Sequence, residues 1–177
     1  MRRLGLVMAV LLMSGAVCAG QDTVANPVTT TVKELLPRFE KNMVAAADAM
    51  PADKFSFKPT AEMNTFAHLT MHIAMSNNGL CAKISGQAAP EVKLTDTDPK
   101  DTLVAALKAS FEYCSTALTG VDDSKLGDSL PWFGGRHTSR AGALIALTDD
   151  WFDHYGTQAV YLRLNGILPP TAQAAKK

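Results

Sequence analysis

Four histidines and one aspartate carry most of the chemistry that this sequence could perform. The histidines are His68, His72, His137 and His154, and Asp150 stands four residues before His154. His68 and His72 are also four residues apart. On a helix, residues four apart lie on neighbouring turns of one face, so both members of such a pair can reach one point. Each pair could therefore supply two ligands to one metal ion.

The position of each residue on its helix predicts which side chains point inward. At about 100° per residue, His72 lies roughly 90° from the centre of its helix's apolar stripe, and His68 roughly 130° away. On the last helix, His154 lies within about 50° of the inner centre and Asp150 about 90° from it. These angles predict that His72, Asp150 and His154 converge at one end of a cavity in a bundle, with His68 and His137 outside it.

Two imidazoles and one carboxylate form a ligand set that suits zinc, nickel, iron or manganese with open positions for water or substrate. The segment that begins at His68 lacks the glutamate of the zinc-protease HExxH motif, because Leu69 follows the first histidine. A working site would place the ligand atoms about 3–4 Å apart and give each histidine a partner on its other nitrogen. The alternative is that His154 packs at a helix interface while Asp150 is solvated beside Asp149.

The elements that must position these residues are helical. Apolar residues recur at three- and four-residue spacing, and no strand pattern of useful length is present. Pro37 either lies in the first turn of the first helix or kinks it. Residues 121–137 form an irregular connection in which Trp132 and Phe133 are interpreted as core or lid packing, with a substrate cage as the alternative. The sequence predicts an all-α fold, a four-helix bundle over residues 32–170, with helices at about 32–50, 62–85, 99–119 and 138–165.

The first residues have the layout of a secretory signal peptide. Arg2 and Arg3 precede an apolar stretch, and small residues surround a cleavage site after Ala19. We expect removal of residues 1–19 and an exported protein, periplasmic or secreted. Lipidation of Cys18 and an uncleaved anchor are the alternatives. The mature chain would have a polar lead-in at residues 20–31 and a disordered tail at residues 171–177.

Charge argues against a nucleic-acid partner, and hydropathy argues against a membrane span in the mature chain. The whole chain has 17 basic and 17 acidic residues, and removal of the leader leaves 15 against 17. A nucleic-acid partner would need a concentrated basic face, which the sequence lacks. No second apolar run is long enough to span a membrane. We expect a small-molecule substrate or ligand, and a homodimer remains open.

Cys81 and Cys114 are the two cysteines of the mature chain. We expect both to be buried and unpaired. In a direct antiparallel hairpin of the second and third helices, the two positions would be staggered by roughly 15 Å, which is beyond the reach of a disulfide. A break in either helix would allow the alternative, a disulfide between them.

Three segments together resemble the DinB family of four-helix proteins, and in particular its exported bacterial branch. They are FSFKPT, then HIA at residues 72–74, then DHYGTQAVYLRLNGILPP at residues 153–170. The resemblance covers about residues 32–170. Many family members bind a metal through three histidines, and these positions correspond to His72, Asp150 and His154. This sequence departs from the family pattern at Asp150, where the family has histidine.

The resemblance implies a divalent-metal-dependent hydrolase or thiol transferase acting on an unknown small molecule. Fold alone does not fix function, and members of this family differ widely. The alternative is a non-catalytic exported bundle whose degenerate metal site binds a small ligand or a partner.

Overall fold

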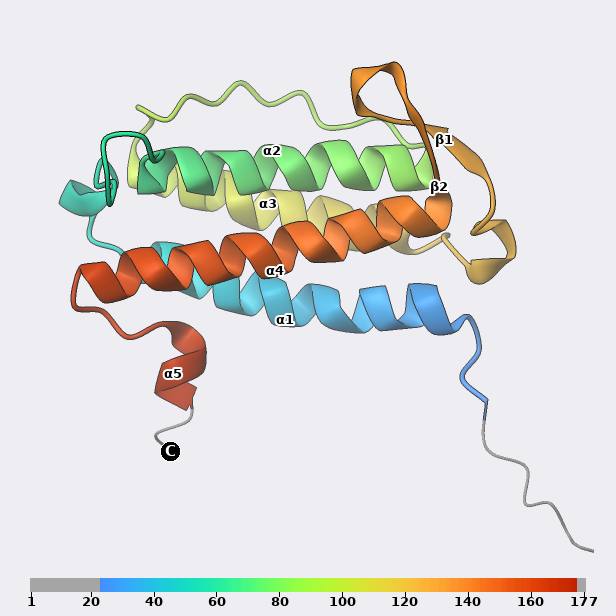
Figure 1. Cartoon of the computed structure of the whole chain (residues 1–177), viewed down its shortest axis with the longest axis horizontal. Helices are drawn as coiled ribbons and strands as arrows, with labels where there is room; N and C mark the ends of the chain where they lie inside the picture. Colours follow the sequence, from blue (N-terminus) through green and yellow to red (C-terminus); the bar gives the residue numbers. More distant parts are fainter. Residues whose placement is uncertain (1–22, 175–177) are drawn as a thin grey trace, which may run out of the picture.

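A computed structural model describes residues 23–174, and it is mostly helical, as predicted (Figure 1). The signal-peptide prediction falls on residues 1–19, which lie outside the described residues. Within residues 23–174, no helix combines the length and apolarity needed to cross a membrane. Four long helices form the bundle, namely α1 (Pro27–Ala49), α2 (Phe66–Ser85), α3 (Lys100–Leu118) and α4 (Arg140–Leu164). The shorter elements are β1 (Ser129–Pro131), β2 (His137–Ser139) and α5 (Pro170–Ala174), with 3-10 turns at Ala52–Lys54, Asp123–Lys125 and Phe133–Gly135.

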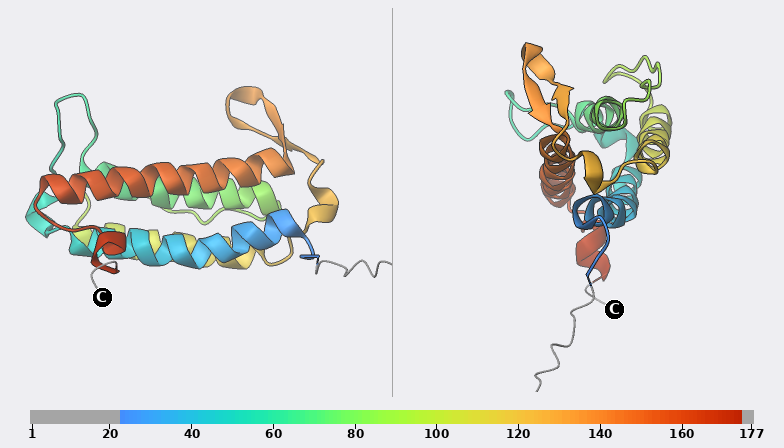
Figure 2. Two further views of the ribbon diagram at one scale, coloured as in Figure 1. Left: turned by 60° about the horizontal axis from the view of Figure 1, so that its bottom comes forward. Right: turned by 90° about the vertical axis from the view of Figure 1, so that its right-hand side faces the viewer.

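The connection between α2 and α3 determines the topology. Residues 86–99 run back along the bundle, so α2 and α3 point in one direction while α1 and α4 point in the other (Figures 1 and 2). Tyr113 Oη donates a hydrogen bond to the Ala88 carbonyl at 3.0 Å near one end of this connection. At its other end, Lys100 Nζ donates to the carbonyls of Asp48 and Met50 at 2.7 and 2.8 Å. The helices α2 and α3 are therefore parallel neighbours joined by a crossover.

This topology corrects the prediction that the cysteines are unpaired. Cys81 and Cys114 form a disulfide with a Cα–Cα distance of 5.3 Å, and both residues are buried. The predicted stagger assumed a direct antiparallel hairpin. In the parallel arrangement, Cys81 lies fifteen residues after the start of α2 and Cys114 fourteen after the start of α3, so the two are level. The crossover brings the cysteines together without any break in a helix.

The first helix begins at Pro27 and not near residue 32, so part of the expected lead-in is helical. The backbone N–H groups of its first turn have no partner within the helix, and a distant segment supplies the acceptor. Asp123 accepts hydrogen bonds from the backbone nitrogens of Val28 and Thr29, both at 2.9 Å. A carboxylate at this position also complements the positive end of the helix dipole. Pro37 lies inside α1, which rules out the first-turn interpretation.

The expected disordered tail is ordered in part. Residues 170–174 form α5, and Thr171 is held by Tyr155 of α4. The Tyr155 hydroxyl donates to Thr171 Oγ1 at 2.9 Å and accepts from the Thr171 backbone nitrogen at 3.1 Å. These long-range bonds fix a segment that local sequence pattern leaves without structure. Residues 175–177 lie outside the described residues.

A buried polar chain sets the rotation of three helices about their axes. Trp151 Nε1 donates to Asn77 Oδ1 at 2.7 Å, and Asn77 Nδ2 donates to Ser110 Oγ at 3.0 Å. All three side chains are buried, so α2, α3 and α4 must each present one polar group to the same point. His72 lies five residues before Asn77, and His154 lies three after Trp151. This chain therefore helps to fix where both histidines point.

The connection before α4 contains a small hairpin. β1 and β2 pair antiparallel, with Leu130 opposite Thr138. Gly134 and Gly135 have φ of +65° and +71°, a backbone conformation that glycine adopts without strain, and they close the turn. The hairpin stands beside the end of the bundle where α4 begins (Figure 1).

Candidate metal centre

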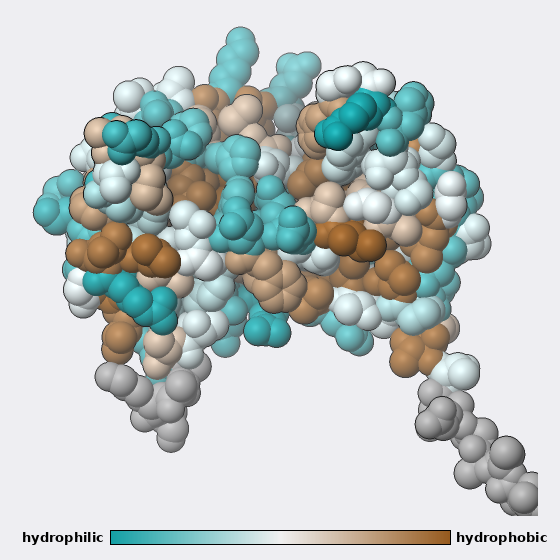
Figure 3. Space-filling model, viewed as in Figure 1, coloured by the Kyte–Doolittle hydropathy of each residue, from teal (hydrophilic) through white to brown (hydrophobic). Residues whose placement is uncertain are grey.

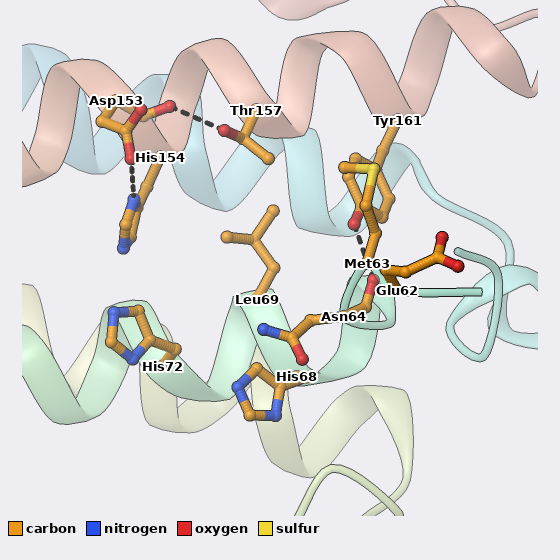
Figure 4. Close-up of a pocket in the computed structure, with 10 residues that line it drawn as sticks. All are labelled: Glu62, Met63, Asn64, His68, Leu69, His72, Asp153, His154, Thr157 and Tyr161. Carbon is orange, nitrogen blue, oxygen red and sulfur yellow. Dashed lines mark hydrogen bonds and ion pairs between the residues drawn. The ribbon is translucent and has the colours of Figure 1, made fainter. Parts of the chain in front are cut away.

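The structure brings together the three residues that helical spacing predicted to converge. His72 of α2 and the pair Asp150 and His154 of α4 each offer one ligand atom, and these atoms lie within 4.8 Å of one another. His154 Nε2 lies 3.6 Å from Asp150 Oδ1. The rings of His72 and His154 face each other across the gap between α2 and α4, with centroids 4.9 Å apart (Figure 4). The group could hold a metal ion, although it is slightly wider than the 3–4 Å expected of a loaded site.

Two buried atoms of this group have no hydrogen-bond partner within residues 23–174. They are His154 Nε2 and Asp150 Oδ2. The other ring nitrogen of His154, Nδ1, lies 3.0 Å from Asp153 Oδ2. When Nδ1 carries the proton and donates it to Asp153, Nε2 keeps its lone pair, which is the arrangement that second-sphere carboxylates impose on metal-binding histidines. An unpartnered buried nitrogen beside an unpartnered carboxylate oxygen fits a divalent cation.

The electrostatics of the centre also favour a bound cation. His72 is exposed overall, but partial burial of its side chain lowers its pKa, and the neighbouring His154 lowers it further. The neutral imidazole that results is the form that binds metals. Burial also raises the pKa of Asp150, and the attraction of His154 and His72 offsets only part of this effect. A divalent cation would compensate the cost of burying the Asp150 carboxylate.

His72 has a hydroxyl neighbour on its own helix. Ser76 Oγ lies 3.3 Å from His72 Nε2, one helical turn further along α2. This contact orients the imidazole, but it differs from the Asp153 contact because a serine hydroxyl can rotate away and serve as either donor or acceptor.

The structure corrects the prediction that His68 lies outside the cavity. It lines the same cleft as His72 and His154, and its ring is stacked on that of His72 at 6.4 Å between centroids. His68 Nδ1 also lies 3.6 Å from Asp96 Oδ2 in the crossover segment. The angle from the apolar stripe misplaced it because the cleft opens along the flank of α2 and not along its buried face. His137 is exposed on β2, near Ser129, and does not line this cleft.

The cleft that contains the histidines has a volume of about 390 Å³ and a mixed lining. At its far end, Tyr161 Oη donates to the Asn64 carbonyl at 2.6 Å, and burial raises the pKa of this tyrosine (Figure 4). Sequence spacing gave Tyr161 no visible partner, and it gave Asp153 no role. The only local signal for Asp153 was its position next to His154, which does not show where a side chain points.

Asp150→Asn is expected to stabilise the metal-free protein, by roughly 1 kcal/mol. The side chain is 18% exposed, and its raised pKa means that folding disfavours the charged form. The native state therefore binds a proton more tightly than the unfolded chain, and stability is lost as pH rises from the ordinary value of 3.8 through the folded pKa. The advantage of the variant should grow over this interval and stay constant above it.

Urea unfolding of both proteins at several pH values, with chelator present, measures this effect. A variant that is less stable than the parent at pH values above the folded pKa would show that attraction to His154 outweighs burial at Asp150. The same substitution removes the carboxylate ligand, so metal addition should stabilise the parent more than the variant.

Comparisons with known proteins agree with this geometry. The model of the DinB superfamily matches residues 35–157. A DinB-like protein from Bacillus cereus is 16% identical over 80% of this chain and 95% of its own, with a TM-score of 0.67. A DinB-like protein from Bacillus subtilis is 20% identical over 77% and 92%, with a TM-score of 0.64.

A mycothiol-dependent maleylpyruvate isomerase is also similar, at 15% identity and a TM-score of 0.58 over 72% of this chain and 59% of the isomerase. No curated protein matches the chain. At these identities the solved structures share the fold, and they leave activity open. The family model covers most of the bundle, including all three candidate ligands, and the chain belongs to the DinB superfamily.

Proposed function

We propose that the mature protein is an exported metalloenzyme that binds one divalent cation through His72, Asp150 and His154. It would act as a hydrolase or thiol transferase on a small molecule. The observation that carries the proposal is the convergence of these ligands, with His154 Nε2 and Asp150 Oδ2 buried and unpartnered. Zinc, nickel, iron and manganese all accept two imidazoles and a carboxylate.

The surrounding residues support a reactive site more than a purely structural one. A divalent cation bound here would lower the pKa of a bound water or thiol. It would also polarise the substrate bond that the deprotonated water or thiol attacks. Asp153 would hold His154 in the ligating tautomer. His68, paired with Asp96, lies beside the ligands where it could accept or deliver a proton. The cleft is within the usual size range for small-molecule sites.

The choice between water and thiol as the attacking group rests on weaker support. The name of the isomerase among the similar structures states that it depends on mycothiol, a thiol. That dependence belongs to the isomerase, and it makes thiol transfer one reasonable form of the proposal. Hydrolysis requires only a metal-bound water, and the same ligand set supplies it.

Export is supported by the disulfide as well as by the leader sequence. Disulfides form and persist in oxidising compartments and are rare in the bacterial cytoplasm. The Cys81–Cys114 bond is buried between α2 and α3, where it fits the native packing. A periplasmic or secreted location is consistent with both features.

The test uses the untagged protein purified from the periplasm of a Gram-negative host. Its N-terminal residue should be Gly20, and elemental analysis should find about one divalent ion per chain. In protein reloaded with Co²⁺, added azide should change the visible spectrum, because a catalytic site keeps an open coordination position.

A chain that contains no metal and does not bind Co²⁺ would contradict the proposal. It would favour the non-catalytic alternative, for which Asp150 in place of the family histidine is the specific observation. A loaded site whose spectrum is insensitive to azide would also contradict an enzymatic role, because the ion would then be closed to substrate.

A further inference from the structure

The metal centre borders a second cleft on its other side. This cleft has a volume of about 450 Å³, and it shares His72 and Asp150 with the ligand set. Small-molecule sites commonly have this size and a mostly apolar lining with a few polar groups. Apart from Ser76, Gly79 and the two shared residues, its lining is apolar, formed by Met75, Leu80, Ala146, Trp132 and Phe133.

The hairpin holds two aromatic rings at this cleft. The Trp132 backbone nitrogen donates to the Arg136 carbonyl at 2.8 Å, which closes the turn beyond the aromatic pair. The rings of Trp132 and Phe133 meet edge to face at 4.9 Å. Phe133 is 51% exposed, and Met75 across the cleft is 50% exposed. Core packing therefore does not account for Phe133 and Met75, and a lining role does, whereas Trp132 is partly buried against the core.

The apolar character of this region continues on the surface. In the face shown in Figure 3, apolar patches lie on both sides of a polar centre, and one of them is in the half of the molecule that contains the hairpin. Lys83 Nζ lies 5.0 Å from the Phe133 ring centroid, which places a single cation at the aromatic pair.

This second cleft is lined in part by a glycine in the middle of helix α2. Gly79 of α2 lines the cleft, and a Cβ atom built there would meet no atom within 4 Å. Glycine weakens a helix interior relative to alanine. Packing against neighbouring protein atoms does not require glycine here, and a larger side chain at this position would project into the cleft.

We infer that this cleft binds a small aromatic molecule that carries a hydroxyl, thiol or amine group at one end. The aromatic body would contact Trp132 and Phe133, and the donor group would lie at the polar edge of the cleft formed by Ser76, His72 and Asp150. A thiol or hydroxyl there would lie beside the candidate ligands. The inference deepens the proposed function by naming its substrate class, and it rests on that function only for the chemical step after binding.

The experiment measures binding of 2-naphthol to the full mature chain by calorimetry, with chelator present so that no metal is needed. Gly79→Leu should weaken binding at least about ten-fold, because the new side chain enters the cleft from a Cβ position that meets no protein atom within 4 Å. Gly156→Leu is the matched control, since Gly156 is an exposed α4 glycine with equally open surroundings, and it should change affinity less than about two-fold. Both variants should melt at or above the parent temperature, because each replaces a helical glycine.

Trp132→Ala provides a second arm and should weaken binding roughly ten-fold. Because Trp132 is partly buried against the core, circular dichroism checks that this variant folds. Equal affinity of the two leucine variants, or the absence of 2-naphthol binding by the parent, would overturn the inference. The metal content of the same preparations is measured separately, before any chelator is added. Binding of 2-naphthol by a chain that takes up no metal would support the inferred cleft and contradict the proposed metalloenzyme. Metal uptake by a chain that does not bind 2-naphthol would support the metalloenzyme and contradict the inferred cleft.

Discussion

His154→Ala is expected to abolish stoichiometric metal binding, whereas His68→Ala leaves it intact. His154 supplies a buried nitrogen without a partner, oriented by Asp153. His68 lines the same cleft, but it is not among the three residues whose ligand atoms converge. Because loss of a second-sphere partner alone costs about 10–100-fold in affinity, loss of the ligand itself should cost at least about 100-fold. Elemental analysis and titration against a chelator of known affinity measure both variants.

The two variants form a matched pair, since each removes one imidazole from the same cleft. Neither histidine is fully buried, so both variants should fold, and circular dichroism checks this. Asp153→Ala adds an intermediate case with an expected loss of about 10–100-fold. Equal metal content in the His154 and His68 variants would show that the site had been misassigned.

Loss of the disulfide should produce the largest change in stability. Cys81 and Cys114 are 33 residues apart in the sequence, and closing a loop of that length in the unfolded chain is worth about 3–4 kcal/mol. The double variant Cys81→Ala/Cys114→Ala should therefore lose roughly that much free energy of unfolding, as measured by urea denaturation. The unfolded, unreduced mature protein should contain no free thiols.

Truncating two buried residues also leaves small cavities, and the control must separate this effect from the cross-link. The parent protein, unfolded and refolded with dithiothreitol, keeps both sulfurs and lacks only the bond. It should lose most of the same free energy. A reduced parent as stable as the oxidised one, or two free thiols in protein from an oxidising compartment, would contradict the disulfide.

The sequence by itself was sufficient for features that depend on local spacing. Helical periodicity predicted α2, α3 and α4 to within a few residues, because burial of one face selects residues at every third or fourth position. The pairing of Asp150 with His154 follows from their spacing on one helix. The convergence of His72 with that pair was also predictable, since the inward faces of two packed helices must meet. The resemblance to the DinB family was confirmed by the family model, which matches residues 35–157.

Tertiary structure decided the features that depend on the direction and contacts of distant segments. The crossover at residues 86–99 makes α2 and α3 parallel, and this reversal pairs Cys81 with Cys114. The side of α2 along which the cleft opens places His68 inside it. Helical periodicity fixes the angle of a residue about its helix axis, but it contains no information on whether the next helix runs parallel or antiparallel. That choice belongs to loop anchoring and core packing, which are long-range interactions.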